Sequence, residues 1–420
     1  MKGKYSLPVV KAVDLIWTSF DKEEMRRGYE MLLQAGQKGD ADALCFIARC
    51  HMGEEYVWSG GGFATDDDNA SLLMQRSALM GSATGVLCAV RSGNFTPSVE
   101  RGMPFASFKE AYEEVLAQAE RGNAFCQYLI GNVYYWGDYL MVEPELAHQF
   151  KNVEAYNEFA YPIARKYYER SFRGRITAGW GNYRNIWKSG LSPENPELYE
   201  SYFIQLAEIS PVVCCSYGIY LDTEKNDKQG ALSYYIRAAH RGDIQATFNA
   251  GCCYDQGSGV EQDIDMAFRF YEIAAIGGEA GAQWQVGYYY FDGWGSVEQD
   301  YAKAAYWFQQ AYENPNGNCE LRSAAYLAIC YQDGLGVVQD YDIAFSYLEV
   351  VEDQTDELWD PINAMVLNAL GVAYAYGLGT EQDIELGREN LEAAAKLGSE
   401  TAKENLQYLE QQGKKRKIDD

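Results

Sequence analysis

The sequence has few histidines, few prolines and a shortage of positive charge. It contains 3 histidines and 10 prolines in 420 residues, and 61 aspartates and glutamates outnumber 35 lysines and arginines, giving a formal net charge of −26. Histidine is a common general base and the commonest metal ligand among side chains, so both kinds of site are poorly supplied. The excess of carboxylates repels a phosphate backbone, and we therefore expect no nucleic-acid binding.

Several kinds of segment are also missing. Lys11 and Asp14 interrupt the apolar residues near the N-terminus, so the sequence predicts no signal peptide. No apolar run is long enough to cross a bilayer, and we expect no membrane insertion. The triplet Gly60-Gly61-Gly62 is not followed by the Lys-Ser/Thr pair that completes a phosphate-binding loop. Because no metal-ligand or nucleotide motif is present, we expect no cofactor and no metal.

What the sequence does contain is a repeated pattern, seen most completely in residues 246–278. Small and aromatic residues at helical spacing form one face of a first helix over 246–254. The loop Gly257-Ser258-Gly259 ends that helix, because glycine accepts left-handed backbone conformations. Asp263 is placed to cap a second helix, whose buried stripe covers 267–275. The segment therefore predicts one helical hairpin.

The same unit recurs along the chain. The glycine loop returns at 293–295, 334–336 and 377–379, each time followed by Gln-Asp. The second helices share a stripe that begins with a small residue and has bulky residues three and four positions later. Such alternation lets two helices approach closely and interlock with the next pair. Ten second helices follow this rule or a looser form of it, and their stripes begin at Gly28, Ala70, Ala111, Ala164, Tyr199, Ala231, Ala267, Ala304, Ala344 and Gly387.

A glycine-punctuated period in the mid-thirties to low forties is typical of stacked helical hairpins. We therefore predict an all-α fold, a right-handed α/α superhelical solenoid of about ten helical hairpins over residues 1–412. Residues 1–229 hold degenerate repeats with insertions at 54–65 and 138–158, residues 230–412 hold regular repeats, and a basic-acidic tail follows at 413–420. No linker rich in proline or serine separates domains, so we expect one continuous array.

At these residues the sequence resembles the Sel-1-like repeat family, relatives of the tetratricopeptide solenoids. The resemblance is closest over 231–398, where each repeat carries several of the family's alanines, glycines and aromatic residues. It implies the solenoid fold and a function as a non-enzymatic scaffold or adaptor that mediates protein–protein interaction. Some bacterial members of the family serve in host interaction, and a secreted subgroup is stapled by disulfides.

The ten cysteines favour reduced thiols. Nine fall on first helices and Cys319 lies between helices, so no hairpin has two cysteines placed to staple it. This departs from the disulfide-rich branch of the family and favours small buried residues in a reducing compartment. Adjacent cysteines on one helix point apart and do not converge on a metal. We therefore expect a cytoplasmic protein.

The sequence offers little to catalysis. His51 follows Cys50, but adjacent helical residues diverge by about 100° and cannot face each other. His240 lies at a helix C-terminus, where a cation is favourable, and His148 has no evident partner in its insertion. Aspartates that recur before each second helix are explained as caps. We expect that the protein is not an enzyme, and an enzyme hidden in the degenerate repeats is the weakest alternative.

A binding surface is expected instead on the first helices, which line the concave face in tetratricopeptide-like stacks. Positions two, six and nine residues after the first buried residue project away from the buried set. Exposed aromatic residues there would form a groove that grips a peptide or helix, whereas stacking of the hairpins would make them part of the core. We predict such a groove for a protein or peptide partner, with the contact residues Tyr128, Asn132, Tyr135, Phe248, Asp255, Trp284, Tyr288 and Phe291.

The charge of the regular repeats indicates which partner this groove prefers. Residues 230–412 contain 8 lysines and arginines against 29 aspartates and glutamates, a net charge of −21. Together with the aromatic residues, this charge favours a partner that is basic and partly apolar, although solubility alone also explains it. An alternative function is that of a bacterial effector or immunity-type protein that binds one specific target protein.

The tail has the opposite charge. Its four consecutive basic residues, Lys414–Lys417, resemble a nuclear import signal. Short basic runs are also common as solvated tails, which is the simpler interpretation, so the expected location stays cytoplasmic.

Overall fold

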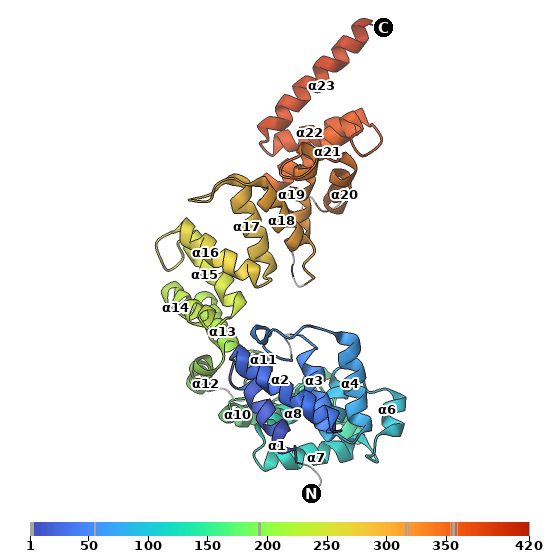
Figure 1. The fold of residues 1–420 in the computed structure, drawn as a ribbon, viewed down its shortest axis with the longest axis vertical. Helices are drawn as coiled ribbons and strands as arrows, with labels where there is room; N and C mark the ends of the chain where they lie inside the picture. The colour runs from blue at the N-terminus through green and yellow to red at the C-terminus, as the bar shows by residue number, and fades with distance from the viewer. Residues whose placement is uncertain are drawn as a thin grey trace. The chain divides into compact units, whose positions relative to one another are not determined.

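The computed structural model describes residues 4–53, 56–191, 195–315, 317, 319–352, 354, 358 and 360–419. All regular secondary structure in this part of the chain is helical (Figure 1). The chain divides into two compact units: unit 1 is Met1–Asn226 with His240–Asp243, and unit 2 is Asp227–Ala239 with Ile244–Asp420. Each unit is built mainly from pairs of neighbouring helices.

Unit 1 contains five such pairs, the further helix α13 and the short elements η1, α6, α9 and η2. The pairs are α1 with α2, α3 with α4, α5 with α7, α8 with α10, and α11 with α12. The bounds are α1 (Leu7–Trp17), α2 (Lys22–Gln37), α3 (Ala41–Cys50), η1 (Ser59–Gly61), α4 (Asp67–Leu79), α5 (Ala83–Arg91), α6 (Pro97–Gly102), α7 (Phe108–Glu120), α8 (Ala124–Tyr135), α9 (Tyr139–Val142), η2 (Pro144–Gln149), α10 (Val153–Arg173), α11 (Trp180–Ser189), α12 (Pro196–Ile209) and α13 (Pro211–Thr223).

Unit 2 begins with α14 and contains four pairs, α15 with α16, α17 with α18, α19 with α20, and α21 with α22. A last helix, α23, packs on α22 and α21. The bounds are α14 (Lys228–Ala239), α15 (Ile244–Gln256), α16 (Ile264–Ile276), α17 (Ala280–Asp292), α18 (Tyr301–Tyr312), α19 (Glu320–Asp333), α20 (Tyr341–Glu352), α21 (Asp360–Tyr376), α22 (Ile384–Lys396) and α23 (Glu400–Asp419).

The predicted hairpins are confirmed. The ten second helices are α2, α4, α7, α10, α12, α14, α16, α18, α20 and α22, and the residue that begins each stripe is buried in every one of them. A small side chain at this position allows the two helix backbones to come close, so burial of the stripe follows from the sequence pattern. The fold is an all-α array of helical hairpins.

One contact recurs inside the hairpins. A bulky residue four positions after the start of the stripe packs on a glycine of the paired first helix. A Cβ added to Gly251 of α15 would lie 2.7 Å from the Tyr271 ring, and one added to Gly287 of α17 would lie equally close to the Phe308 ring. Only glycine leaves room for these rings. The pairs Gly131–Tyr168 and Gly371–Leu391 repeat the contact.

The sequence pattern assigned Phe270 to the buried stripe beside Tyr271, and this is only partly right. Tyr271 is fully buried, whereas Phe270 is half-buried and stacks on Tyr254 with ring centroids 5.6 Å apart. Successive helical residues are separated by about 100°, so only one of two neighbours can point straight at the paired helix.

Each glycine loop joins the two helices of one hairpin and packs against the hairpin before it. In the loop 334–336 both glycines have positive φ, +69° at Gly334 and +72° at Gly336. A Cβ on Gly336 would also overlap the backbone of Tyr301 and Ala302 at the start of α18. Glycine is therefore required there both by its backbone conformation and by the close approach of the preceding second helix.

The predicted helix caps are present as well. Asp263 Oδ1 accepts a hydrogen bond from the Met266 amide at 2.9 Å, and Asp300 Oδ1 accepts one from the Lys303 amide at 3.1 Å. Asp340 and Asp383 cap α20 and α22 in the same way. These carboxylates satisfy backbone donors at helix N-termini, and the repeat architecture explains them fully.

The insertions and the tail add short elements. The insertion 138–158 contains the single turn α9, followed by η2 and the start of α10. Of the insertion 54–65, residues 54 and 55 lie outside the described residues, and η1 lies within the rest. The final helix, α23, continues through the tail to Asp419.

Candidate functional site

The eight predicted contact residues all lie on first helices, but they are less exposed than expected. Tyr128, Asn132 and Trp284 are buried, and the other five are half-buried. Trp284 on α17 is covered by the next hairpin, since the Arg322 guanidinium lies 5.4 Å from the centre of its ring. The neighbouring Tyr288 ring stacks on the Trp284 ring with centroids 5.6 Å apart. Stacking of consecutive hairpins has turned part of the predicted groove into core.

Part of the predicted groove in unit 2 remains accessible. Tyr288 on α17 is half-buried, and the centroid of its ring lies 5.9 Å from that of Trp294, which is 41% exposed. Trp294 Nε1 donates a hydrogen bond to Asp292 Oδ2 at 3.4 Å. Burial, together with the carboxylates of Asp292 and Asp255, raises the pKa of Tyr288 to about 12. We call Asp255, Tyr288, Asp292 and Trp294 the acidic-aromatic patch.

Two of the predicted residues in unit 2 have structural roles that the sequence did not reveal. Asp255 Oδ1 accepts a hydrogen bond from the Tyr289 hydroxyl at 2.9 Å, and Asp255 Oδ2 accepts one from the Tyr271 hydroxyl at 3.3 Å. Phe291 packs between hairpins, with its ring centroid 5.1 Å from that of Tyr326 on α19. The two hydrogen bonds fix the Asp255 carboxylate of the patch, and the ring contact fixes Phe291 on the same helix as Tyr288. Core residues therefore set the geometry of the patch.

A second site lies in unit 1 and includes Tyr128 and Asn132, two of the three residues that the sequence predicted there; the third, Tyr135, does not line it. Tyr128 and Asn132 line a cavity of about 630 Å³ whose walls come mainly from α3, α5, α8 and α11. We call it the unit 1 cavity. Four first helices therefore contribute to one hollow, and three arginines line it, Arg49, Arg91 and Arg184. Asp138 is the acidic residue in its wall.

Arg49 of α3 is the most unusual residue of the unit 1 cavity because it is only 2% exposed. Its guanidinium lies 5.1 to 5.6 Å from the ring centres of Tyr56, Phe125 and Tyr128. Arg49 Nη2 donates to the Tyr128 hydroxyl at 3.3 Å and Nη1 donates to Cys88 Sγ at 3.7 Å, while Nε has no hydrogen-bond partner among the described residues. A buried cation is thus held by aromatic rings, a hydroxyl and a thiol.

The thiol that faces Arg49 is itself perturbed. Cys88 of α5 is 3% exposed and lines the cavity. The hydrogen bond with Cys45 lowers the pKa of the Cys88 thiol, and the positive charge of Arg49 lowers it further. Cys45 and Arg49 thus both favour the deprotonated form of the Cys88 thiol.

The other two arginines reach the cavity from α5 and α11. The Arg91 guanidinium lies 4.1 Å from the centre of the Trp136 ring. Arg184 Nε is buried and has no hydrogen-bond partner in the described part of the chain. Burial raises the pKa of Asp138, and the charge of Arg91 opposes that rise.

Two asparagines of the cavity lining, Asn132 and Asn182, form a hydrogen-bonded group with Tyr168 of α10. The Tyr168 hydroxyl donates to Asn132 Oδ1 at 2.8 Å. Asn182 Nδ2 donates to the same Asn132 oxygen and to the Tyr168 hydroxyl, at 3.1 Å each. These bonds join α8, α10 and α11, and they fix the orientation of the Asn132 and Asn182 amide groups.

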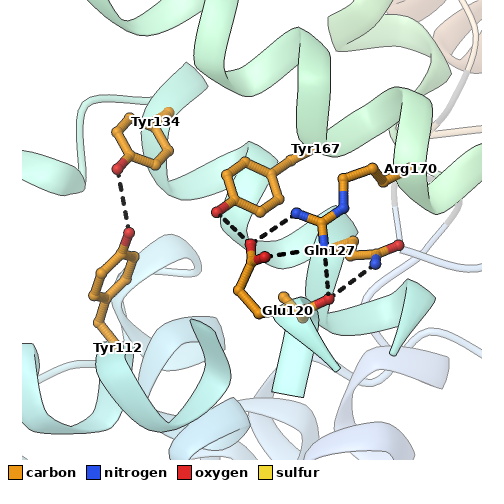
Figure 2. Close-up of polar contacts among 7 residues, drawn as sticks. Tyr112, Glu120, Gln127, Tyr134, Tyr167 and Arg170 are labelled. Carbon is orange, nitrogen blue, oxygen red and sulfur yellow. Dashed lines mark hydrogen bonds and ion pairs between the residues drawn. The ribbon is translucent and has the colours of Figure 1, made fainter. Parts of the chain in front are cut away.

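Helix α8, which carries Tyr128 and Asn132, is held in place by its neighbours α7 and α10 (Figure 2). Gln127 Nε2 on α8 and Arg170 Nη2 on α10 both donate to the Ala119 carbonyl of α7, at 2.9 and 3.1 Å. Arg170 Nη1 forms an ion pair with Glu120 Oε1 at 2.7 Å, and the Tyr167 hydroxyl donates to the same oxygen. These bonds join α8 and α10 to the C-terminal end of α7, and they hold in place the helix that carries Tyr128 and Asn132.

The histidine next to Cys50 has a structural function. His51 Nε2 lies 2.6 Å from the Tyr29 hydroxyl, and Nδ1 lies 2.7 Å from the Ala64 carbonyl oxygen. Both ring nitrogens thereby tie the 54–65 insertion to α2. Among the described residues, no group of three histidine, cysteine or acidic side chains is arranged to hold a metal ion. No helix in this part of the chain is long and apolar enough to cross a membrane.

Sequence reasoning missed the three arginines of the cavity. Arg91 and Arg184 carry no local signal, because a charged residue on a helix is normally solvated. Arg49 did carry one, since it is the only basic residue in the otherwise apolar stretch 43–50. A charge on the buried face of a helix points to a polar interior.

The fold is a series of helical hairpins, and in the regular repeats a glycine loop joins the two helices of each hairpin. In several hairpins a bulky residue of one helix packs on a glycine of the other. These features define an α/α repeat protein. The family model of the Sel1 repeat matches six segments of the chain, 124–150, 205–243, 244–279, 280–316, 321–349 and 364–399. These six segments are therefore Sel1 repeats, and they form an α/α solenoid of the kind related to the tetratricopeptide repeats.

The chain is similar over short segments to curated proteins. It is 32% identical over 128 residues to chitin synthase regulatory factor 2 of Schizosaccharomyces pombe, covering 29% of this chain and 25% of that protein. It is 40% identical over 82 residues to chitin synthase regulatory factor 4 of the same yeast, covering 19% and 12%. The third relative is DAP3-binding cell death enhancer 1 of Rattus norvegicus, 39% identical over 57 residues, covering 14% and 11%. The matches span a quarter or less of each relative.

Two solved structures are also similar. One is a Sel1 repeat protein from Oxalobacter formigenes, 22% identical with a TM-score of 0.40, covering 56% of this chain and 85% of that one. The other is c5321, described as a protective antigen of uropathogenic Escherichia coli strains with an SLR fold. It is 21% identical with a TM-score of 0.48, covering 98% of this chain and 88% of that one.

Proposed function

We propose that this protein is a non-catalytic scaffold that binds a basic, partly apolar segment of a partner protein at the acidic-aromatic patch of unit 2. The observation that carries the proposal is the position of the half-buried Tyr288 ring, beside the exposed Trp294 and under the influence of the Asp255 and Asp292 carboxylates. Aromatic rings supply apolar contact and a negative π-face, and the carboxylates supply charge complementary to lysine or arginine.

The chain supplies an internal example of the proposed contact. Arg322 places its guanidinium 5.4 Å from the centre of the Trp284 ring, in the same aromatic cluster that includes Tyr288. A basic side chain of a partner would occupy the equivalent position over Trp294 or Tyr288. The net charge of −21 on residues 230–412 would speed its approach, since charge complementarity acts mainly on the association rate.

The family and the relatives support a scaffold function. Two relatives are regulatory factors by name, which is compatible with a protein that acts by binding other proteins. The similarity is confined to a quarter or less of those proteins, so the target of regulation does not transfer from them. A protein-binding solenoid in the cytoplasm is the function that we infer.

The proposal is tested with two pools of fluorescein-labelled peptides. One pool holds lysine and arginine with leucine and phenylalanine, and the other replaces every basic residue with glutamine. Fluorescence anisotropy should show binding of the basic pool, weaker at about 0.5 M NaCl than at about 0.05 M because salt screens the attraction. Equal binding of both pools would contradict the proposal.

Two variants locate the site. Trp294→Ala and Asp292→Asn should each weaken binding of the basic pool by about fivefold or more, since each removes one element of the patch. The matched control is Glu381→Gln, which removes an exposed carboxylate of unit 2 away from the patch. If the control loses as much affinity as Asp292→Asn, the binding is nonspecific attraction to the acidic surface. Capture of partners from lysate with wild type and Trp294→Ala then identifies the natural segment.

A further inference from the structure

We propose that the unit 1 cavity is a second binding site, which takes an oxyanion group of a peptide and holds it with Arg49, Arg91 and Arg184. This site goes beyond the function proposed for the acidic-aromatic patch, because it lies in the other unit and prefers ligands of the opposite charge. The favoured ligand is a carboxylate, from an acidic side chain or from a peptide C-terminus.

The charge of the cavity is the first argument. Three guanidinium groups and one carboxylate, that of Asp138, line it, in a chain whose formal net charge is −26. Arg49 is buried, whereas Arg91 and Arg184 are half-buried, and a charge that is taken out of water is normally paired because an unpaired buried charge is costly. No ion pair joins any of these three arginines to a carboxylate within the described residues. An anionic ligand would supply the missing counter-charge.

The unsatisfied donors are the second argument. Arg49 is 98% buried, since only 2% of its surface is exposed, and its Nε has no hydrogen-bond partner among the described residues. Arg184 Nε is buried and equally without a partner there. Buried donors of this kind are nearly always hydrogen-bonded in folded proteins. Guanidinium groups present paired N–H donors that match the two oxygens of a carboxylate, so such a ligand would satisfy donors that the chain leaves open.

The remaining lining suits a peptide. Asn132, Asn182 and Asn185 contribute amide groups, which can pair with the donors and acceptors of a peptide backbone. Tyr128 and Trp136 add aromatic surface. A volume of about 630 Å³ falls within the range of about 300–1,000 Å³ typical of ligand pockets, so it accommodates a few residues but no folded domain.

Four fluorescein-labelled pentapeptides test the proposal by fluorescence anisotropy. They share one core and differ only in carrying two glutamates or two glutamines, each with a free or an amidated C-terminus. The peptide with both glutamates and a free C-terminus should bind, and the glutamine amide should not. The two mixed peptides show whether side-chain or terminal carboxylates are used. A fifth peptide, with phosphoserine in place of glutamate, distinguishes phosphate from carboxylate as the source of the oxyanion.

Three variants assign the binding to the cavity. Arg91→Met and Arg184→Met should each lower the affinity for the acidic peptide by about tenfold or more, since each removes a charge-assisted contact. Arg184→Lys should recover only part of that loss, because lysine keeps the charge and loses the paired donors. The matched control Arg101→Met removes an exposed arginine of α6 in unit 1 and should change nothing. Circular dichroism and melting curves confirm that the variants are folded.

Three outcomes would overturn the proposal. They are equal binding of the glutamine amide and the acidic peptide, a loss in Arg101→Met as large as in Arg184→Met, and no binding of any oxyanion peptide at about 1 mM, the weak limit of specific recognition. None of these outcomes bears on the acidic-aromatic patch, whose test uses basic peptides and variants of unit 2.

Discussion

Asp42 on α3 is a carboxylate that the fold removes from water. The Ser82 hydroxyl, at the N-cap of α5, donates a hydrogen bond to Asp42 Oδ1 at 2.5 Å. Burial raises the pKa of Asp42 to about 6, the Ser82 bond opposes the rise, and the charges of Asp40 and Glu114 add to it. At this position the native state binds a proton more tightly than the unfolded chain does.

This shift predicts a pH-dependent effect of Asp42→Asn. Because the folded pKa is raised, the contribution of Asp42 to stability is fully present below about pH 4 and is lost as the pH rises through about 6. Asparagine stays neutral and keeps the acceptor for Ser82. We expect Asp42→Asn to be more stable than wild type by roughly 1–3 kcal/mol at about pH 7.5, with a smaller difference at about pH 5.

Urea denaturation at the two pH values measures the difference directly. Asp68→Asn, an exposed carboxylate of α4, serves as the control and should show no pH-dependent gain. A variant that is equally destabilised at both pH values would show that Asp42 is needed as a charged acceptor.

At the scale of the element, the glycine loops decide how one hairpin meets the one before it. The second glycine of each loop lies against the start of the preceding second helix, as Gly336 does against α18 and Gly379 against α20. Gly398, after α22, also has a positive φ of +98° but has no atom within contact distance of an added Cβ. Comparing substitutions at Gly336 and Gly398 therefore separates the cost of a positive φ from the cost of steric overlap.

We expect Gly336→Ala to destabilise the protein more than Gly398→Ala. Strain from a positive φ applies to both and costs about 1–2 kcal/mol. The overlap with Tyr301 and Ala302 applies to Gly336 alone and adds about 1–3 kcal/mol, the usual cost of forcing extra atoms into a packed site. Chemical denaturation of the two variants checks the order. Equal losses would mean that α18 moves aside freely and that the loop does not fix the hairpins.

At the scale of the molecule, negative charge is concentrated in the regular repeats. Residues 230–412 carry −21 of the total of −26. Like charges on one compact unit repel one another and lower its stability, and salt screens this repulsion. We expect the melting temperature to rise by about 2–4 °C between about 0.05 and 0.5 M NaCl, corresponding to roughly 1 kcal/mol.

Differential scanning fluorimetry measures this rise. A variant with the exposed residues Glu381, Glu389, Glu392 and Glu410 changed to glutamine should show a smaller salt dependence. If the melting temperature falls with salt, favourable ion pairs outweigh the repulsion, and the acidic surface is not a source of instability.

The sequence by itself determined the hairpins. The small residues that begin the stripes, the Asp263-type caps and the paired glycines of loops such as 334–336 are set by neighbours a few positions away. Helical geometry is fixed at about 3.6 residues per turn, so spacing along the chain reveals which side chains share a face. The repeat period also made the number of hairpins readable without any knowledge of their packing.

Only the tertiary structure decided which first-helix residues stay accessible. Trp284 is buried because Arg322, from the following hairpin, covers it, while Trp294 stays exposed in its loop. The unit 1 cavity joins Arg49, Arg91 and Arg184, which lie far apart in the sequence and on three different helices. Helical spacing describes one helix at a time, whereas burial and the shape of a cavity depend on contacts between helices, and those contacts exist only in the folded chain.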